Sequence, residues 1–245
     1  MSSQQRPAVV LLHGANASGS IMRPLADALR PHVEVFAPDL LGHGGRPVPE
    51  RLTIEALAAD VLVYLDSNKV NRTFVFGFSS GGSLALYLAR HFPQRVIGVA
   101  TLAAKYVFDK RTIAHWTHLT DPERLGRPGN KRAQELTETH QPQNWIDVTN
   151  NNRRMFEEFG RKPPLSEADL RAITVPAILF SSDQDQIVPL EEVLALGKLI
   201  PDARTVIFRG QCHPFSVVPF AAMSIAIRNW MDDVLSRSTS SNPQV

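Results

Sequence analysis

Short, continuous runs of hydrophobic residues recur along the chain, separated by polar and turn-forming segments. Continuous rather than alternating hydrophobicity indicates strands that are covered on both faces, as in a parallel sheet. Most residues in these runs are β-branched, aromatic or leucine. The runs predict six strands, at residues 8–12, 33–37, 73–78, 96–102, 176–181 and 204–208.

Helical patterns fill most of the gaps between these runs, with hydrophobic residues three and four positions apart. In the segment 53–66, for example, Ile54, Leu57, Val61 and Leu65 share one helical face. The pattern predicts helices at residues 22–29, 53–66, 80–91, 190–199 and 220–235. Strand–helix repetition of this kind predicts a doubly wound α/β fold with a mainly parallel sheet of about six strands.

The alternation stops between the fourth and fifth predicted strands. Residues 105–165 contain no convincing strand, but they include Trp116 and Trp145 and several turn signals. The segment predicts a helical insertion, with residues 1–104 and 166–245 forming the α/β core around it. The tail at 236–245 has little hydrophobic content, and we expect it to fray.

Composition and charge narrow the class of protein. The chain has 245 residues, 43% of them hydrophobic, and its formal net charge is 26 − 24 = +2. This balance gives no support for binding to nucleic acid or to an anionic membrane. No hydrophobic run approaches the length of a membrane span, and the start lacks a signal-peptide core. With one cysteine in the whole sequence, Cys212, a disulfide framework is excluded. We therefore expect a cytoplasmic protein.

A G-x-S-x-G turn follows the third predicted strand and precedes a helix. A serine at such a sharp turn is raised above the end of the sheet, and its strained backbone needs glycine on both sides. Ser79 has Gly77 and Gly81 at the required spacing, whereas Ser80 would have Phe78 two positions before it. We therefore expect Ser79 to be a nucleophile. The alternative is a glycine-rich connection without chemistry.

A serine hydroxyl needs a neighbouring base, and in this architecture the acid and the histidine follow the serine in the sequence. The fifth predicted strand is followed by Asp183 and Asp185, and the sixth by His213. These loops should meet at the sheet edge where Ser79 lies. His213 would take the serine proton, and one of the two aspartates would orient its ring.

Acyl transfer also needs donors for the negative oxygen that develops on the substrate. The backbone N–H of Ser80, at the start of a helix, is one candidate. The second should come from the loop after the first strand, where we expect Ala15, with Asn16 as an alternative. This loop lacks the G-x-G-x-x-G or G-K-[ST] pattern of a nucleotide site.

Other reactive residue types have simpler interpretations. His115 and His118 are one helical turn apart, but no third ligand for a metal is evident. Cys212 lies outside the turn, so we expect a small buried residue rather than a thiol nucleophile. We expect no metal, no cofactor and a small-molecule substrate as the partner, and the sequence does not indicate an oligomeric state.

With these motifs assembled, the chain resembles the α/β-hydrolase superfamily over most of residues 8–235 outside the insertion. The resemblance depends on the stretches LLHGANAS, PDLLGHG, GFSSGG, SSDQDQIVP and QCHPF. It implies Asp185, four residues before Pro189, as the acid, with Asp183 in reserve. It also implies structural roles for His13 and Asp39.

In the same family, a helical cap covers the substrate pocket at the position of the insertion. The resemblance therefore implies that Trp116 and Trp145 line the pocket, together with Asn16 and Phe78 near the nucleophile. The chain departs from the family pattern at Arg46 and Cys212, where relatives usually have serine and glycine. Relatives often begin with two antiparallel strands, whereas here we expect an all-parallel sheet.

The nucleophile favours one chemistry over its neighbours in the superfamily. A serine argues against haloalkane dehalogenases, which use aspartate. Epoxide hydrolysis is equally disfavoured, because no aspartate precedes the serine position either. Carbon–carbon hydrolases usually have asparagine before the serine and tryptophan after the histidine, where this chain has Phe78 and Pro214. We expect hydrolysis of a carboxylic ester, lactone or thioester. An acyltransferase, or a ligand-binding protein on a hydrolase scaffold, remains an alternative.

Overall fold

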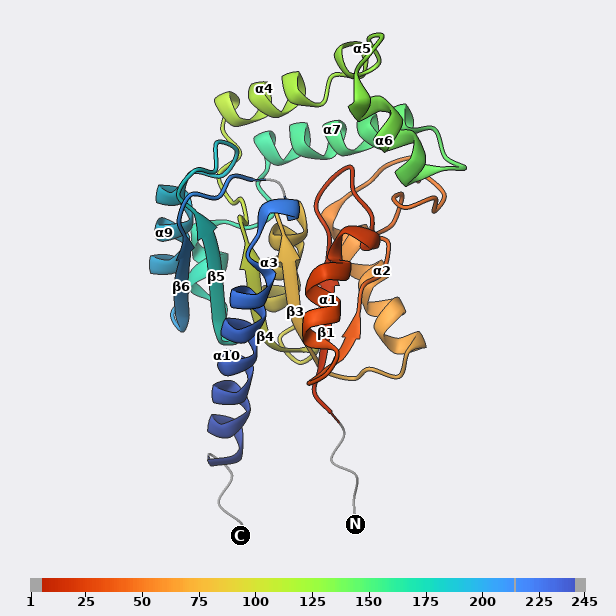
Figure 1. Cartoon of the computed structure of the whole chain (residues 1–245). Helices are drawn as coiled ribbons and strands as arrows, with labels where there is room; N and C mark the ends of the chain where they lie inside the picture. The colour runs from red at the N-terminus through yellow and green to blue at the C-terminus, as the bar shows by residue number, and fades with distance from the viewer. Residues whose placement is uncertain (1–5, 214, 241–245) are drawn as a thin grey trace.

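A six-stranded parallel sheet forms the centre of the protein, seen in a computed structural model that describes residues 6–213 and 215–240. The strand order is β2-β1-β3-β4-β5-β6 (Figure 1). Every pair of neighbouring strands is parallel, which confirms the predicted doubly wound α/β fold. The strands are β1 (Ala8–Leu12), β2 (Glu34–Phe36), β3 (Thr73–Phe78), β4 (Val96–Leu102), β5 (Ala177–Ser182) and β6 (Ala203–Phe208).

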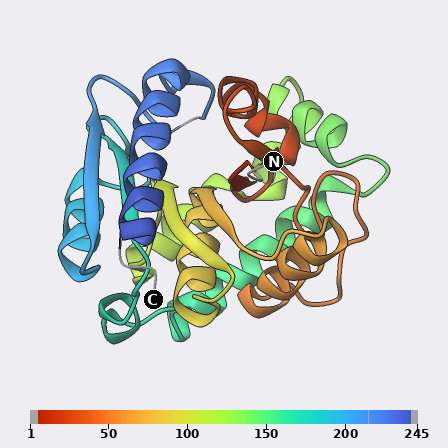
Figure 2. The same cartoon turned by 90° about the horizontal axis from the view of Figure 1, so that it is seen from below.

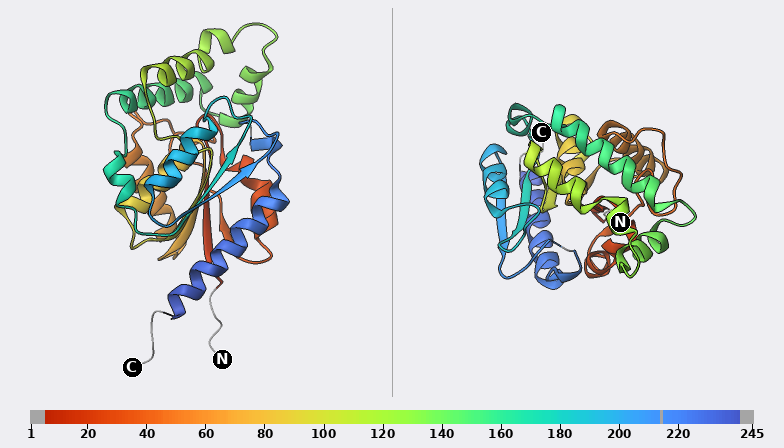
Figure 3. Two further views of the ribbon diagram at one scale, coloured as in Figure 1. Left: turned by 90° about the vertical axis from the view of Figure 1, so that its left-hand side faces the viewer. Right: turned by 90° about the horizontal axis from the view of Figure 1, so that it is seen from above.

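Helices cover the sheet in two layers (Figures 2 and 3). Helices α1 (Arg23–Leu29) and α10 (Phe220–Ser240) pack against each other on one face. The other face carries α2 (Ile54–Ser67), α3 (Ser80–His91), α8 (Glu167–Arg171) and α9 (Leu190–Leu199). Two short 3₁₀ helices, η1 (Gly19–Met22) and η2 (Phe215–Val217), lie in the connections. Among the described helices, none is both long and apolar enough to cross a membrane.

The edge strand β6 is less buried than its sequence suggested. Helix α9 packs against β5 and β6, whereas α10 packs against β4, so the outer strand is covered on one face only. Ile207 is 43% exposed as a result. The expectation that all six strands are covered on both faces is therefore wrong for β6.

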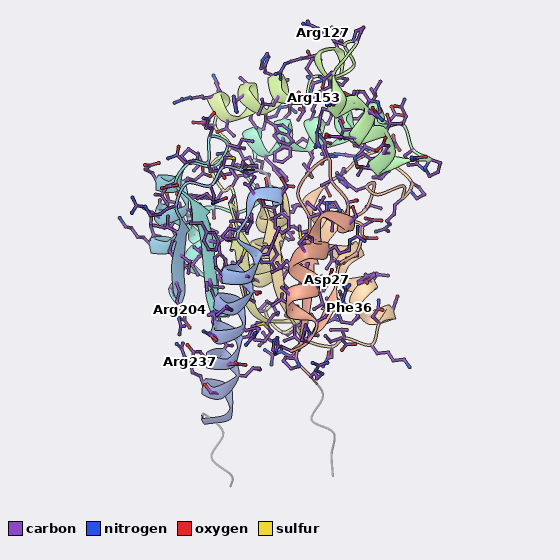
Figure 4. The ribbon with its side chains drawn as sticks, in the orientation of Figure 1. Asp27, Phe36, Arg127, Arg153, Arg204 and Arg237 are labelled. Carbon is purple, nitrogen blue, oxygen red and sulfur yellow. The ribbon has the colours of Figure 1, made fainter. Side chains whose placement is uncertain are left out.

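Helix α10 extends beyond the predicted end. It continues to Ser240, so the prediction of a frayed tail is wrong for residues 236–240, while 241–245 lie outside the described residues. Within this extension, Arg237 pairs with Asp202 at 3.2 Å. Figure 4 shows Arg204 and Arg237 at the end of the sheet remote from Arg127 and Arg153.

Large aromatic side chains fill the core between the sheet and α10. Trp230 packs edge-on against Phe74, with ring centroids 5.4 Å apart. The close approach requires a glycine on the neighbouring strand, because a Cβ atom at Gly98 would lie 2.8 Å from the Trp230 ring. Burial of each such ring stabilises the fold by about 1.5–3 kcal/mol.

The segment 105–165, which we call the inserted segment, forms four helices across the carboxyl ends of the strands (Figures 1 and 3). Each helix begins after an aspartate or asparagine whose side chain accepts a hydrogen bond from a backbone N–H of the first turn, a favoured N-terminal cap. The helices are α4 (Lys110–Leu119), α5 (Pro122–Leu125), α6 (Lys131–His140) and α7 (Trp145–Arg161).

Polar contacts join the inserted segment to the core at both ends. At its start, Glu192 of α9 pairs with Lys105 at 2.6 Å and accepts hydrogen bonds from the N–H groups of Tyr106 and Val107. On α7, the Asn151 side chain accepts from the Leu52 N–H at 3.2 Å and donates to a core carbonyl.

Three histidines from distant parts of the sequence meet at this junction. His13 follows β1, His43 lies in the loop after β2, and His140 ends α6. The His43 ring lies 5.2 Å from the His13 ring and 6.0 Å from the His140 ring. The Gly44 N–H donates to Nδ1 of His140 at 3.2 Å, which ties the inserted segment to this loop.

Burial keeps these histidines neutral. It lowers the pKa of His13 to about 3 and the pKa of His43 to about 4, from an ordinary value of 6.5. Burial also lowers the pKa of His140. Burial of a positive charge is the largest cause in all three cases.

We predict that acid destabilises the fold well before the carboxylates titrate. Below pH 6.5 the unfolded chain binds protons at these histidines that the folded chain cannot bind. The stability is fully present above that pH and falls as the pH drops towards about 4, by up to about 1.4 kcal/mol per pH unit for each histidine. Urea unfolding between pH 7 and pH 5 measures this slope.

The control for this prediction is a histidine outside the cluster. His43→Gln should flatten the pH dependence, while replacement of exposed His118 by Gln should leave it unchanged. Equal slopes for His43→Gln and the parent protein would contradict the prediction.

Candidate active site

Ser79 occupies a strained turn between β3 and α3. Its backbone angles are φ 54° and ψ −120°, in the left-handed region that non-glycine residues rarely adopt. The Ser79 N–H donates to the Leu102 carbonyl at 2.9 Å, and its own carbonyl accepts from the Gly82 N–H at 2.8 Å. These bonds on both sides hold the serine at the carboxyl end of the sheet.

The glycines around Ser79 are required by close backbone contacts. A Cβ atom at Gly77 would lie 2.1 Å from the carbonyl oxygen of Gly81. A Cβ atom at Gly81 would lie 2.3 Å from the carbonyl oxygen of Leu12 on β1. Any side chain at either glycine would therefore collide with the backbone, which is the steric reason for the G-x-S-x-G spacing that the sequence suggested.

Ser79, His213 and Asp185 form a continuous chain of hydrogen-bonding groups. Nε2 of His213 lies 3.2 Å from Oγ of Ser79, and Nδ1 lies 2.8 Å from Oδ2 of Asp185. A carboxylate can only accept, so Nδ1 carries the proton of the neutral ring and Nε2 presents its lone pair to the serine. This is the tautomer that a general base requires.

Asp185 is held firmly in the loop after β5. Its side chain is 1% exposed, and Oδ1 accepts from the N–H groups of Ile187 and Val188 at 2.8 and 2.9 Å. The other candidate, Asp183, faces elsewhere and accepts from the Gly210 N–H at 2.6 Å. The structure therefore brings Asp185, and not Asp183, to the histidine.

Two backbone N–H groups flank the serine without a partner. Within the described residues, neither the amide of Ala15 nor that of Ser80 has a hydrogen-bond acceptor. Both residues line cavities that also contain Ser79. This arrangement leaves the two amides available to a negative oxygen on a bound molecule.

His13 lies next to this loop but points into the core. Its Nδ1 lies 2.8 Å from the Gly14 carbonyl, and its Nε2 accepts from the Leu40 N–H at 3.0 Å. Asp39 similarly accepts from the Gly19 N–H at 2.7 Å. In place of the family serine, Arg46 forms a two-pronged ion pair with Asp60, both contacts at 2.7 Å.

Two cavities meet at Ser79, beneath the inserted segment. Their volumes are about 550 and 670 Å³, and Ser79, Trp116 and Ile187 line both. The smaller cavity carries many charged groups, among them Lys105, Asp109, Arg111, Glu191 and Glu192. The larger cavity has fewer charged groups, Arg23 and Arg132 among them, and its wall includes the apolar side chains of Phe78, Leu119, Leu125, Leu136, Phe215 and Phe220.

The predicted pocket residues divide between these places. Asn16 and Phe78 line the larger cavity and Trp116 lines both, whereas Trp145 is not among the lining residues of either. Trp145 is the first residue of α7, and the cavity-lining part of that helix, at Phe156, lies about three turns further along. The expectation for Trp145 is therefore wrong.

The structure differs from the sequence-based predictions in the exposure of Cys212 and in the residues that line the larger cavity. Cys212 is exposed, so its predicted burial is wrong. Among the described residues, no group of three or more potential ligands could hold a metal ion. Ile187 and Phe215 line the larger cavity and were not identified from the sequence, although each lies within two residues of Asp185 or His213.

Comparisons with known proteins identify relatives of the chain. A bifunctional biotin biosynthesis protein of Cellvibrio japonicus, BioHC, is 28% identical over 85% of this chain, which spans 44% of that protein's length. The pimeloyl-[acyl-carrier protein] methyl ester esterase of Xylella fastidiosa (strain M23) is 28% identical, covering 81% of this chain and 84% of the esterase.

Solved structures agree on the fold. A thermophilic esterase from Thermogutta terrifontis superimposes with a TM-score of 0.72 at 23% identity, covering 94% of this chain and 91% of the esterase. The alpha/beta hydrolase family matches residues 9–221, which is most of the sequence. The chain therefore belongs to the α/β hydrolase family.

Proposed function

We propose that the protein is a serine hydrolase that cleaves a carboxylic ester through an acyl-enzyme intermediate. The hydrogen-bonded chain of Ser79, His213 and Asp185 carries this proposal, because it supplies nucleophile, base and orienting carboxylate in one place. The relatives support an ester-cleaving activity, since one of them is named as a methyl ester esterase.

In the first half of the reaction, Oγ of Ser79 attacks the ester carbonyl carbon while Nε2 of His213 takes the hydroxyl proton. The carbonyl oxygen becomes negative and accepts hydrogen bonds from the N–H groups of Ala15 and Ser80. Asp185 stabilises the imidazolium. When the C–O bond breaks, His213 gives its proton to the departing alcohol, which leaves the acyl group on Ser79.

In the second half, water replaces the alcohol. His213 takes a proton from the water as its oxygen attacks the acyl carbonyl carbon, and the same two N–H groups stabilise the second negative oxygen. The bond to Oγ of Ser79 then breaks, His213 returns the proton to the serine, and a carboxylic acid leaves. A lactone or thioester would follow the same course, and an acyltransferase would admit an alcohol or thiol in place of water.

The cavities support a small, partly apolar substrate. An ester has an acyl part and an alcohol part, one on each side of the carbonyl. The two cavities meet at Ser79, so each could hold one of these two arms. We propose that the more apolar arm occupies the larger cavity. The inserted segment, residues 105–165, would act as a cap on the core formed by 1–104 and 166–245.

A cytoplasmic location of the protein stays a prediction.

We predict that Ser79→Ala lowers kcat for p-nitrophenyl butyrate by about 10⁴-fold or more, because the acyl-enzyme cannot form. A fluorophosphonate probe should label the parent protein at Ser79 and leave the variant unlabelled. Unchanged hydrolysis by the variant would refute the assignment. Absence of labelling in the parent protein would instead favour a ligand-binding role.

The two aspartates of the β5 loop provide a matched pair for the second prediction. Asp185→Asn should lower kcat by about 10⁴-fold, since an amide cannot hold the histidine in the required tautomer. Asp183→Asn should leave kcat within about threefold, since Asp183 contacts the Gly210 N–H instead. Initial rates at pH 8 compare the two, and equal losses would contradict the choice of acid.

A third prediction concerns the larger cavity. Leu119 lines it but not the smaller one, so Leu119→Trp should reduce the space for the apolar arm. Esters lengthened from C2 to C8 should lose kcat/KM progressively in this variant, by about tenfold or more at C8. Val107→Trp, in the smaller cavity, is the control. The same chain-length profile in both variants would contradict the assignment of the arm.

A further inference from the structure

Two side chains of the larger cavity carry donors that have no partner among the described residues: Trp116, whose Nε1 is buried, and Asn16. Asn16 is 6% exposed and lies in this cavity beside Ala15. Its Oδ1 accepts a hydrogen bond from Nδ2 of Asn152 at 3.1 Å. Its own NH₂ group donates to no residue that the structure describes, and so is available to a molecule in the cavity.

The orientation of Asn152 follows from the chemistry of its neighbours. Nδ1 of His43 lies 3.0 Å from the Leu41 carbonyl, so Nδ1 carries the proton of this neutral ring. Nε2 of His43 must then accept, and it lies 3.0 Å from Nδ2 of Asn152. The Val148 carbonyl accepts from the same Nδ2 at 3.0 Å.

Those contacts fix Asn16 in turn. The two hydrogens of the Asn152 NH₂ group are shared among three acceptors, and an acceptor is what Asn16 has to present to that nitrogen. Asn16 therefore presents its oxygen there, which leaves its own NH₂ group as the free end of an amide that lines the larger cavity. The backbone of Asn16 contributes to the same arrangement, with φ at 55°, a conformation that asparagine tolerates better than most residues.

We propose that the Asn16 NH₂ group is an additional donor to the reacting carbonyl oxygen, and that Asn152 is the positioning residue that aims it. The proposal rests on the esterase function proposed above. Asn152 belongs to α7 of the inserted segment, so the donor is oriented only when that segment is seated on the core. Hydrolysis would then depend on a side chain that never touches the substrate.

Asn16→Gly removes the donor, and with it the contact to Asn152, while glycine adopts the backbone φ of 55° freely. We expect kcat for p-nitrophenyl butyrate to fall about 10- to 100-fold, with KM changed less than about twofold, since the bond strengthens as the oxygen becomes negative. Binding of a trifluoromethyl ketone, which forms a tetrahedral adduct with a nucleophilic serine, should weaken by a similar factor.

Asn151 provides the matched control for Asn152. Both are buried side chains on α7 that bond to the core, but Asn151 contacts the Leu52 N–H and the Pro49 carbonyl. Asn152→Ala should reproduce the kcat loss and the weaker inhibitor binding of Asn16→Gly, and Asn151→Ala should do neither. The double variant Asn16→Gly/Asn152→Ala should be about as slow as Asn16→Gly alone, because both changes remove one donor.

The outcomes separate the two proposals. Equal losses in Asn151→Ala and Asn152→Ala, or multiplied losses in the double variant, would show that Asn152 only holds the fold together. Full kcat in Asn16→Gly, with an active parent protein, would overturn only the proposal that Asn16 is a donor.

A parent protein that neither hydrolyses esters nor reacts with fluorophosphonate would overturn the esterase function and this inference with it. If Asn152→Ala does not fold, Asn16→Gly with the inhibitor decides the donor.

Discussion

The strained backbone at Ser79 is the constraint on which the rest of the site depends. A left-handed conformation of this kind costs about 1–3 kcal/mol and persists only where the surroundings enforce it. Here the enforcement comes from neighbouring strands: Leu102 of β4 accepts from the Ser79 N–H, and Leu12 of β1 closes against Gly81. The serine is therefore presented by the centre of the sheet and not by a flexible loop.

Parallel strands explain how distant residues meet this serine. His213 is 134 positions from Ser79 in the sequence, yet each follows the carboxyl end of a strand, and all such ends lie at one edge of the sheet. The acid is positioned by the same rule, since Asp185 follows β5. Two backbone N–H groups then hold its carboxylate, so the histidine contacts a fixed partner.

Sequence patterns could predict the parts of this arrangement that depend on local geometry. The strands, the glycines around Ser79 and the loops that carry Asp185 and His213 follow from hydrophobic period and turn chemistry. The wall of the cavities could not be predicted in the same way. Trp116 and Trp145 both lie in the inserted segment, and the sequence gives no reason to prefer one of them as a pocket residue. The packing of α4 and α7 places Trp116 at the cavity and Trp145 at the start of α7.

The same limit applies to polar contacts across the junction. The contact between Asn152 and Asn16 joins residues 136 positions apart, and no periodic pattern predicts it. Similarly, Cys212 is exposed because the loop after β6 runs along the surface, a property of loop path and not of residue type.

The polar character of this junction has an energetic consequence. An apolar interface of the same size would be held by the hydrophobic effect alone, whereas here buried Oδ1 of Asn152 and Nε2 of His140 have no hydrogen-bond partner. Each such group costs about 1–3 kcal/mol relative to water, so part of the packing energy between segment and core is offset. An offset of this kind lowers the cost of lifting the segment from the core.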